Sequence, residues 1–180
     1  MDRTSAHALG ASLRRRGEPP RRGPGCATVT SGERPDSSPL RIERTFRAPA
    51  SEVFNAWISV DVLRRWWPAG AGWTTPVAEV DAREGGRLRL VMRNPEGEEF
   101  GGRGEYVEVT PPRRLVFTWS WDGSEDDGQR QLVEVDFIDR GDRTTTVVLT
   151  NRGLPDEASS EAHRDGWHAS FDNLDAVLGT

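Results

Sequence analysis

The sequence contains no lysine, because all 24 of its basic residues are arginine. This excludes Schiff-base chemistry and a phosphate-binding P-loop, since both need a lysine amine. The chain has a single cysteine, Cys26, which excludes an internal disulfide and predicts a reducing, cytoplasmic setting. No apolar run is long enough to cross a membrane, and a net charge of −5 does not favour non-specific nucleic-acid binding. We therefore expect neither a membrane nor a nucleic acid as a partner.

The usual catalytic and metal-binding motifs are missing as well. The sequence has no GxSxG, HExxH or CxxC motif and no dinucleotide-binding fingerprint. Its three histidines have no potential metal ligands at matching spacing. We therefore expect no metal and no cofactor, and an enzyme is not the favoured interpretation.

Large apolar residues are scarce in the first 39 residues, which are rich in Arg, Gly, Pro and Ser. Such a segment cannot bury enough surface to offset the entropy lost on ordering. We predict a disordered tail over residues 1–39 and one folded domain over residues 40–180. A transit peptide, an arm for an acidic partner and a start codon placed too early are open alternatives. A secretory signal is excluded, because no apolar segment follows the arginines.

The last 26 residues, 155–180, carry a helical pattern. Large apolar residues recur there at steps of four, three and four, which predicts one apolar stripe on a long helix. Pro155 suits its first turn, and His163 extends the stripe at its polar end. Gly166 is unusual inside a helix and indicates close approach to whatever packs beneath. The stripe consists of Trp167, Phe171, Leu174 and Leu178.

The residues between the tail and this helix alternate between apolar and polar, with turn residues between the runs. The alternation predicts about seven strands in an antiparallel sheet with one apolar face. Two short helices are expected after the first strand, one opening at Pro49 and one over 61–67 with Asp61 as its cap. The glycines of 101–104 indicate a bulge or bend. The predicted strands are 40–48, 76–83, 87–93, 99–109, 114–121, 129–138 and 143–151.

Five segments, taken in order, resemble the START-like (SRPBCC) superfamily and, within it, the family of the activator of heat-shock protein 90 ATPase, C-terminal domain. The resemblance spans about residues 40–179. It implies an α+β helix-grip fold, in which a curved antiparallel sheet of about seven strands wraps around a long C-terminal helix. It also implies two short helices after strand 1 and a cavity between sheet and helix. The segments are RTFRAPASEVFNAW (44–57), LRRWWP (63–68), EGGRLRL (84–90), GEYVEVTPPRRLVFTWSW (104–121) and HRDGWHASFDNLDAVL (163–178).

Aromatic residues on the faces predicted to meet in that cavity are the candidate ligand-binding residues. Many aromatic and few polar groups suit a small apolar or aromatic molecule. His163 is the one imidazole predicted on the cavity side, where it would bond a ligand or move a proton. The alternatives are core filling for the aromatics and a backbone or water contact for the histidine. The candidates are Trp66, Trp67, Trp73, Phe117, Trp119, His163 and Trp167.

Several other residues receive a structural interpretation. Arg44 shares a strand face with apolar residues, so it needs a carboxylate partner or an anionic ligand unless it lies at an edge. Glu105 and Glu134 are its possible partners. The Glu79/Asp81 pair is expected on an exposed face. His168 is expected in solvent and Trp57 in the core.

Three functions follow from the resemblance and the aromatic residues. Binding of a small apolar or aromatic ligand is the leading hypothesis. A protein-interaction module similar to a co-chaperone, which uses the acidic loop Glu125, Asp126 and Asp127, is the second. A polyketide-cyclase-like or hydrolase activity that uses His163 is the third. A wide, dry cavity would favour the first, and a packed interior would favour the second.

Overall fold

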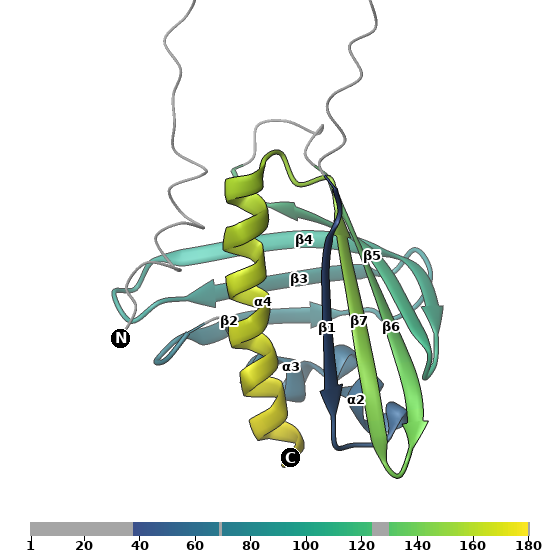
Figure 1. Cartoon of the computed structure of the whole chain (residues 1–180). Coiled ribbons are helices and arrows are strands. Elements are labelled where there is room, and N and C mark those ends of the chain that lie inside the picture. The colour runs from purple at the N-terminus through teal and green to yellow at the C-terminus, as the bar shows by residue number, and fades with distance from the viewer. Residues whose placement is uncertain (1–37, 69, 124–129, 180) are drawn as a thin grey trace, which may run out of the picture.

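A computed structural model describes residues 38–68, 70–123 and 130–179. The predicted tail, except residues 38 and 39, and the acidic residues 125–127 therefore lie outside the described residues. The chain folds into one antiparallel sheet, two short helices and one long helix (Figure 1). The elements are β1 (Leu40–Phe46), α2 (Ala50–Ile58), α3 (Val60–Trp66), β2 (Thr74–Val80), β3 (Arg87–Arg93), β4 (Glu99–Thr110), β5 (Arg114–Trp121), β6 (Gln131–Gly141), β7 (Thr144–Arg152) and α4 (Glu157–Leu178).

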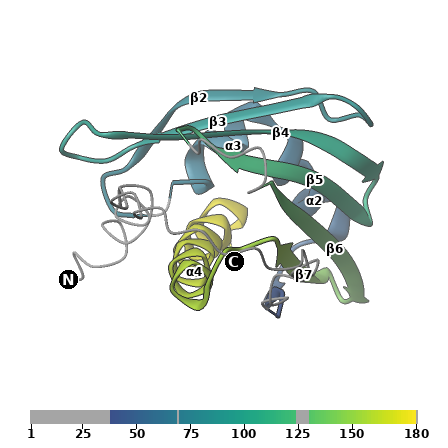
Figure 2. The ribbon, with the colours of Figure 1, turned by 90° about the horizontal axis from the view of Figure 1, so that it is seen from above.

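The sheet has seven strands in the order β1-β7-β6-β5-β4-β3-β2. Every neighbouring pair is antiparallel, and the first strand pairs with the last, so β1 and β7 lie together at one edge of the sheet. The view from above shows the sheet bending around α4, which lies on its concave side (Figure 2). Helix α3 packs against α4 and β2. This is the helix-grip α+β fold that the sequence predicts.

The apolar faces of the sheet and of α4 meet in the core. Leu115 and Phe117 of β5 point inward and are at most 2% exposed, and Phe171 and Leu174 of α4 are completely buried. The ring of Phe171 meets Phe46 of β1 edge to face, with centroids 5.7 Å apart. Removing these side chains from water is the main force that holds the helix on the sheet.

Local hydrogen bonds fix both ends of α4. The carboxylate of Asp156 accepts a bond from the backbone N–H of Ser159 at 2.7 Å, which makes Asp156 the N-cap. This bond lowers the pKa of Asp156. Gly179 ends the helix with φ 75°, a left-handed conformation that glycine adopts without strain. The helix therefore begins at Glu157, two residues after Pro155.

Most predicted element boundaries differ from the structure by one to three residues, and two of these differences have a clear local cause. Strand β2 ends at Val80 rather than 83, because the backbone N–H of Arg83 bonds back to the carbonyl of Asp81 and starts a turn. Helix α3 begins at Val60, so Ser59 rather than Asp61 occupies the cap position, with no side-chain cap bond. In both cases a turn formed by backbone hydrogen bonds overrides the side-chain pattern.

The irregularity of β4 lies between Tyr106 and Glu108, and not at the glycines where the sequence predicts it. Gly102 has a different role. A Cβ atom at this position would lie 2.2 Å from the ring of Trp119 on the neighbouring strand. Glycine therefore allows the indole to lie directly against the backbone of β4.

Arg44 has carboxylate partners, but they are not those proposed from the sequence. Its guanidinium bonds Asp172 at 2.6 Å and also Asp175, so it ties β1 to α4. Burial alone would lower the pKa of Arg44, but the bonds and charges of the two aspartates outweigh it and raise the pKa. Glu134 instead pairs with Arg114 at 2.9 Å.

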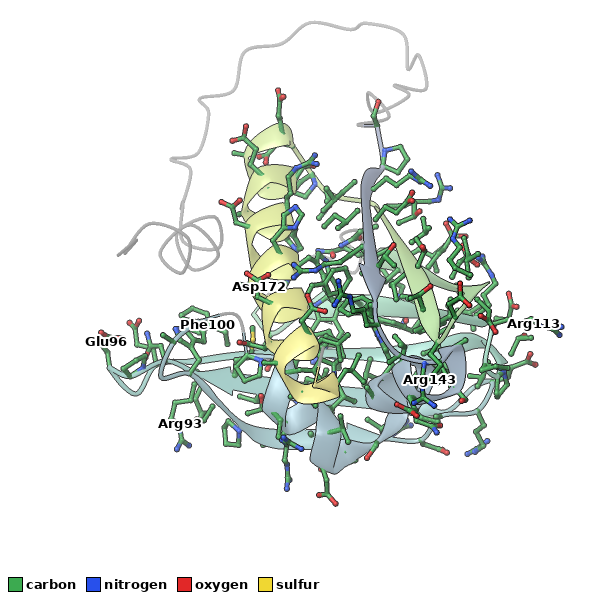
Figure 3. The ribbon with its side chains drawn as sticks, turned by 60° about the horizontal axis from the view of Figure 1, so that its bottom comes forward. Arg93, Glu96, Phe100, Arg113, Arg143 and Asp172 are labelled. Carbon is green, nitrogen blue, oxygen red and sulfur yellow. The ribbon has the colours of Figure 1, made fainter. Side chains whose placement is uncertain are left out.

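The remaining charges lie mostly at the periphery. Figure 3 shows Glu96 and Arg113 pointing away from the body of the molecule, and these two residues and Arg143 are exposed. In the described ranges, no helix has both the length and the apolar character that crossing a membrane requires.

Candidate functional site

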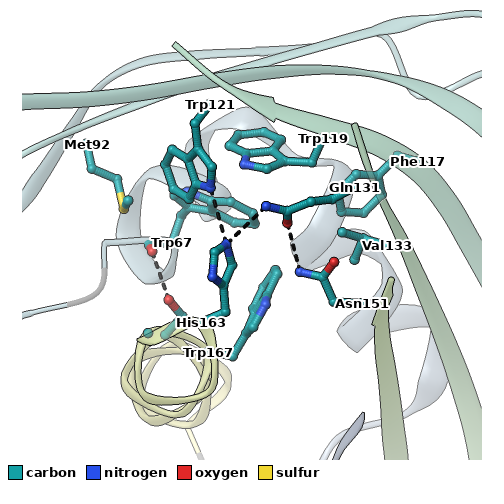
Figure 4. A pocket seen from close by; sticks show the side chains of 12 residues that line it. Trp67, Met92, Phe117, Trp119, Trp121, Gln131, Val133, Asn151, His163 and Trp167 are labelled. Atoms are coloured by element: carbon teal, nitrogen blue, oxygen red, sulfur yellow. Dashed lines mark hydrogen bonds between the residues drawn. The ribbon is translucent and has the colours of Figure 1, made fainter. Parts of the chain in front are cut away.

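A cavity lies between the first half of α4 and the concave face of the sheet (Figure 4). Its volume is about 50 Å³, counted over the positions that the centre of a water molecule can take. One water needs roughly 10–15 Å³ on this measure, so the cavity has room for a few waters or one small ring. Pockets for drug-sized ligands reach roughly 300–1,000 Å³. The cavity is therefore apolar, as predicted, but small rather than wide.

Tryptophans form most of its wall. Trp67, just after α3, meets Trp167 of α4 edge to face with centroids 5.3 Å apart. Trp67 also lies 5.7 Å from Trp119, which meets Trp121 edge to face at 5.4 Å. Such pairs hold the rings in fixed mutual orientations. This part of the wall is therefore a connected set of four indoles from β5, α4 and the residue that follows α3.

One polar group, the imidazole of His163, enters this wall from α4. Its Nδ1 lies 2.7 Å from the carbonyl of Ser159, and a carbonyl can only accept, so Nδ1 carries the proton. The other nitrogen, Nε2, then accepts from the indole N–H of Trp121 and the amide of Gln131, each at 3.2 Å. Burial lowers the pKa of His163, opposed in part by the bond to Ser159. The imidazole is therefore held neutral.

The polar contacts continue from His163 into the sheet. Gln131 of β6 and Asn151 of β7 are 5% and 1% exposed. The side-chain oxygen of Gln131 accepts from the Nδ2 of Asn151 at 3.0 Å. The Oδ1 of Asn151 is buried and has no hydrogen-bond partner within the described part of the chain. A buried amide oxygen left in this state is costly, so the position points to a missing partner.

Residues 47–179 match the family model described as Activator of Hsp90 ATPase homolog 1-like protein. The chain belongs to this family. The AHSA1 protein from Silicibacter pomeroyi is similar, with 31% identity and a TM-score of 0.69 over 79% of this chain and 98% of that one. An HSP90 activator from Plasmodium falciparum has 25% identity and a TM-score of 0.62, over 78% of this chain and 96% of that one. A Chromobacterium violaceum protein, at 23% identity, shares the fold, with a TM-score of 0.71 over 80% and 99%. No curated protein matches the sequence.

In this member of the Hsp90-activator-like family, five of the seven candidate residues line the cavity, and their role in binding remains a prediction. Trp66 and Trp73 do not line it. Trp66 is completely buried, and its indole N–H donates to the carbonyl of Ala56 at 2.8 Å. It packs against the outer side of Trp67, so it supports the wall. The five lining residues are Trp67, Phe117, Trp119, His163 and Trp167.

Trp73 lies in a neighbouring hollow instead. Its ring packs on Phe100 with centroids 5.4 Å apart. The hollow has a volume of about 140 Å³ on the same measure and includes the ion pair between Arg89 and Asp122, whose atoms lie 2.7 Å apart. The side chain of Trp121 lines both spaces. The loop tryptophan therefore belongs to a second, more polar space beside the aromatic cavity.

The candidate residues chosen from the sequence leave out Trp121, Gln131 and Asn151, which also line the cavity. Trp121 continues the inward alternation of β5, so the pattern already contained it. Gln131 lies two residues before Val133 on the same strand, so both side chains are on one face, and Val133 is an inward residue that is 1% exposed. Asn151 likewise follows the buried residues of β7. A polar side chain at an inward position was therefore the available signal, because such a group needs a buried partner.

The positions expected for Glu79, Asp81, His168 and Trp57 agree with the structure. Glu79, Asp81 and His168 are exposed. Trp57 is 3% exposed and belongs to the core. Within residues 38–68, 70–123 and 130–179, no cluster of three or more His, Cys, Asp or Glu side chains could hold a metal ion.

Proposed function

We propose that the cavity binds one small, compact aromatic or apolar molecule. The observation that carries this proposal is the free space of about 50 Å³ lined by four indoles, on a helix that is otherwise anchored by the completely buried Phe171 and Leu174. Well-packed interiors leave few voids larger than a water molecule. Flat aromatic walls favour a ring that can stack on them or meet them edge to face. The small volume favours a single ring over a lipid chain or a fused polycycle.

Tryptophan fluorescence tests the proposal, because Trp67, Trp119, Trp121 and Trp167 all line the cavity. Toluene is a suitable probe for its size, and palmitate is a probe that is too long. Saturable quenching or a spectral shift with toluene, but not with palmitate, is the expected result. No saturable response to toluene or other single-ring compounds would contradict the proposal.

A matched pair of variants locates the binding. Val133 lines the cavity and is 1% exposed, whereas Val107 of β4 is 54% exposed. Val133→Phe places a second ring in the space and is expected to abolish toluene binding. Val107→Phe makes the same chemical change on the surface and is expected to leave binding intact. Equal binding by both variants would place the ligand elsewhere.

The contacts of His163 do not favour catalysis as the function. Its Nδ1 proton is committed to the Ser159 carbonyl, and its Nε2 lone pair accepts from Trp121 and Gln131. A general base needs a free lone pair within reach of the proton that it removes. The imidazole is therefore better suited to holding the cavity wall in position.

A second candidate function is the co-chaperone role, because the chain is 25% identical to an HSP90 activator over 78% of its length. Stimulation of a purified Hsp90 ATPase by this protein would support it. Val133→Phe is expected to leave such stimulation unchanged, because the residue is buried away from any partner surface. Loss of stimulation in this variant would link the cavity to the chaperone activity.

A further inference from the structure

The hydrogen bonds around His163 form a chain with one fixed direction. It begins at the carbonyl of Ser159, which can only accept, so His163 must donate from Nδ1 and accept at Nε2. Trp121 confirms this direction independently, because an indole N–H can only donate and it points at the same Nε2.

The direction passes through the two buried amides. Since Nε2 accepts, Gln131 must present its NH₂ group to the imidazole and its carbonyl oxygen to the other side. That oxygen is met by the NH₂ group of Asn151. Asn151 is therefore left with its own carbonyl oxygen at the free end of the chain. Rotating the side-chain amide of Gln131 or Asn151 by half a turn would place two donors or two acceptors opposite each other.

The free end is a buried acceptor that belongs to a residue lining the cavity. Asn151 is 1% exposed, it lines the cavity, and its Oδ1 has no partner among the residues that the structure describes. Figure 4 shows the run of dashed contacts from His163 through Gln131 to Asn151, beside Trp167. The chain is also self-reinforcing, because each donated bond polarises the next group.

We propose that the molecule bound in the cavity is a small aromatic compound with a hydroxyl or N–H group, and that it donates this hydrogen to the Oδ1 of Asn151. The inference rests on the proposed function and names its ligand class. Phenol is the simplest probe of this class, and toluene has the same shape without a donor. A site that hydrogen-bonds a ligand hydroxyl discriminates against the analogue that leaves its polar group unpaired.

The unmodified protein provides the first test. In protein labelled with ¹³C and ¹⁵N, the side-chain carbonyl carbon of Asn151 is expected to shift on titration with phenol and to stay nearly unchanged with toluene. Equal shifts with both compounds, or none with phenol when phenol binds, would overturn the inference.

A variant provides the second test. Asn151→Leu keeps the size of the side chain and removes the acceptor. It is expected to weaken phenol binding about tenfold without weakening toluene binding, since one neutral hydrogen bond is lost. Asn55→Leu, the same change at an exposed position of α2, is the control and should alter neither affinity. If Asn151→Leu changes both affinities by the same factor, the inference is wrong.

Gln131→Leu tests the direction of the chain. With Gln131 gone, the amide of Asn151 is free to turn and present either end to the cavity. The preference for phenol over anisole, whose oxygen can only accept, is therefore expected to shrink several-fold. An unchanged preference would overturn the directional argument.

The outcomes separate this inference from the proposed function. If toluene binds and the tests on Asn151 give the same result for toluene and phenol, the cavity is a ligand site. The inference that the ligand donates a hydrogen bond to Asn151 is then wrong. If neither compound binds the unmodified protein, the proposed function and the inference fail together.

Discussion

The two halves of α4 lie on the same sheet but differ in what they meet there. In the second half, residues 171–178, Phe171 and Leu174 are completely buried and belong to the hydrophobic core. In the first half, residues 157–170, His163 and Trp167 are half-buried and face the cavity. We call these the closed half and the open half. One helix thus combines a buried anchor with one wall of the cavity.

Polar contacts follow the same division. The closed half is held by side chains that bond rigid backbone or opposite charge, such as Asn173 to the carbonyl of Pro68 at 2.6 Å and Asp172 to Arg44 at 2.6 Å. The open half begins a chain of neutral groups that ends at the Oδ1 of Asn151, for which the described part of the molecule supplies no partner. The side chains of Asp172 and Asn173 therefore have partners, whereas beside the open half the Oδ1 of Asn151 has none among the residues that the structure describes.

The largest expected effect is in the closed half. Phe171→Ala should lower the free energy of unfolding by about 3–5 kcal/mol, because it empties a fully buried site. Trp167→Ala removes a larger ring but should cost only about 1–2 kcal/mol, because that ring is half-exposed and already borders a space. Urea denaturation of both variants measures the difference. Equal losses would show that the two halves do not differ in packing.

A smaller effect is expected from the ion pairs of the closed half. Arg44→Leu leaves Asp172 and Asp175 without their shared cation and should cost about 1.5 kcal/mol, above the range for exposed pairs because the Arg44 side chain is only 28% exposed. Arg41→Leu breaks an ion pair to Glu43 in which both side chains are largely exposed, and it should cost almost nothing. Thermal unfolding at low and high salt compares the two. A greater loss for Arg41→Leu would show that Arg44 does not anchor the helix.

The sequence predicts the layers of this fold well and its polar contacts poorly. Period-two alternation and one helical stripe are enough to place α4 on an apolar sheet face. They report which face a residue lies on, and not which residue lies opposite. Arg44 therefore was correctly expected to need a carboxylate, but its partner Asp172 is 128 positions away on another element.

The same limit explains the candidate site. Trp67 and Trp167 face the cavity, as predicted. The adjacent Trp66 points into the core instead, because successive side chains on a helix point about 100° apart. Gln131 and Asn151 become neighbours only through the register of β6 and β7, in which Val133 is paired with Asn151. That register depends on the bulge near the end of β6, which the side-chain pattern does not reveal.

The start of the open half provides a third test. Asp156→Ala removes the N-cap bond to Ser159 and should lower the free energy of unfolding by about 1 kcal/mol. Asp156→Asn keeps a capping oxygen and should lose less. Because the folded-state pKa of Asp156 is lowered, its contribution is present above the unfolded pKa of the carboxyl group and disappears as the pH falls through the folded value. Denaturation at pH 7 and pH 3 checks both statements, and a pH-independent difference between Asp156→Ala and the unmodified protein would contradict the assignment.

The smallest effect is the titration of His163 in the open half. Its folded-state pKa is lowered, so the unfolded chain binds a proton more readily as the pH falls below the ordinary value of 6.5. Proton binding therefore stabilises the unfolded state at acidic pH. The free energy of unfolding should fall by no more than about 1 kcal/mol between pH 7 and pH 5.5. Protonation would also set a new N–H against the donors of Trp121 and Gln131, which is why the folded state resists it.

Two variants on the same helix isolate that titration. His163→Gln removes the buried imidazole and should flatten the dependence of stability on pH over this range. His168→Gln removes an exposed imidazole, five residues further along α4, and should leave the dependence unchanged. Urea denaturation at half-unit steps of pH provides the curves. If His168→Gln flattens the dependence of stability on pH and His163→Gln does not, the open half does not hold a neutral imidazole. The direction assigned to the hydrogen-bond chain from His163 to Asn151 would then be wrong.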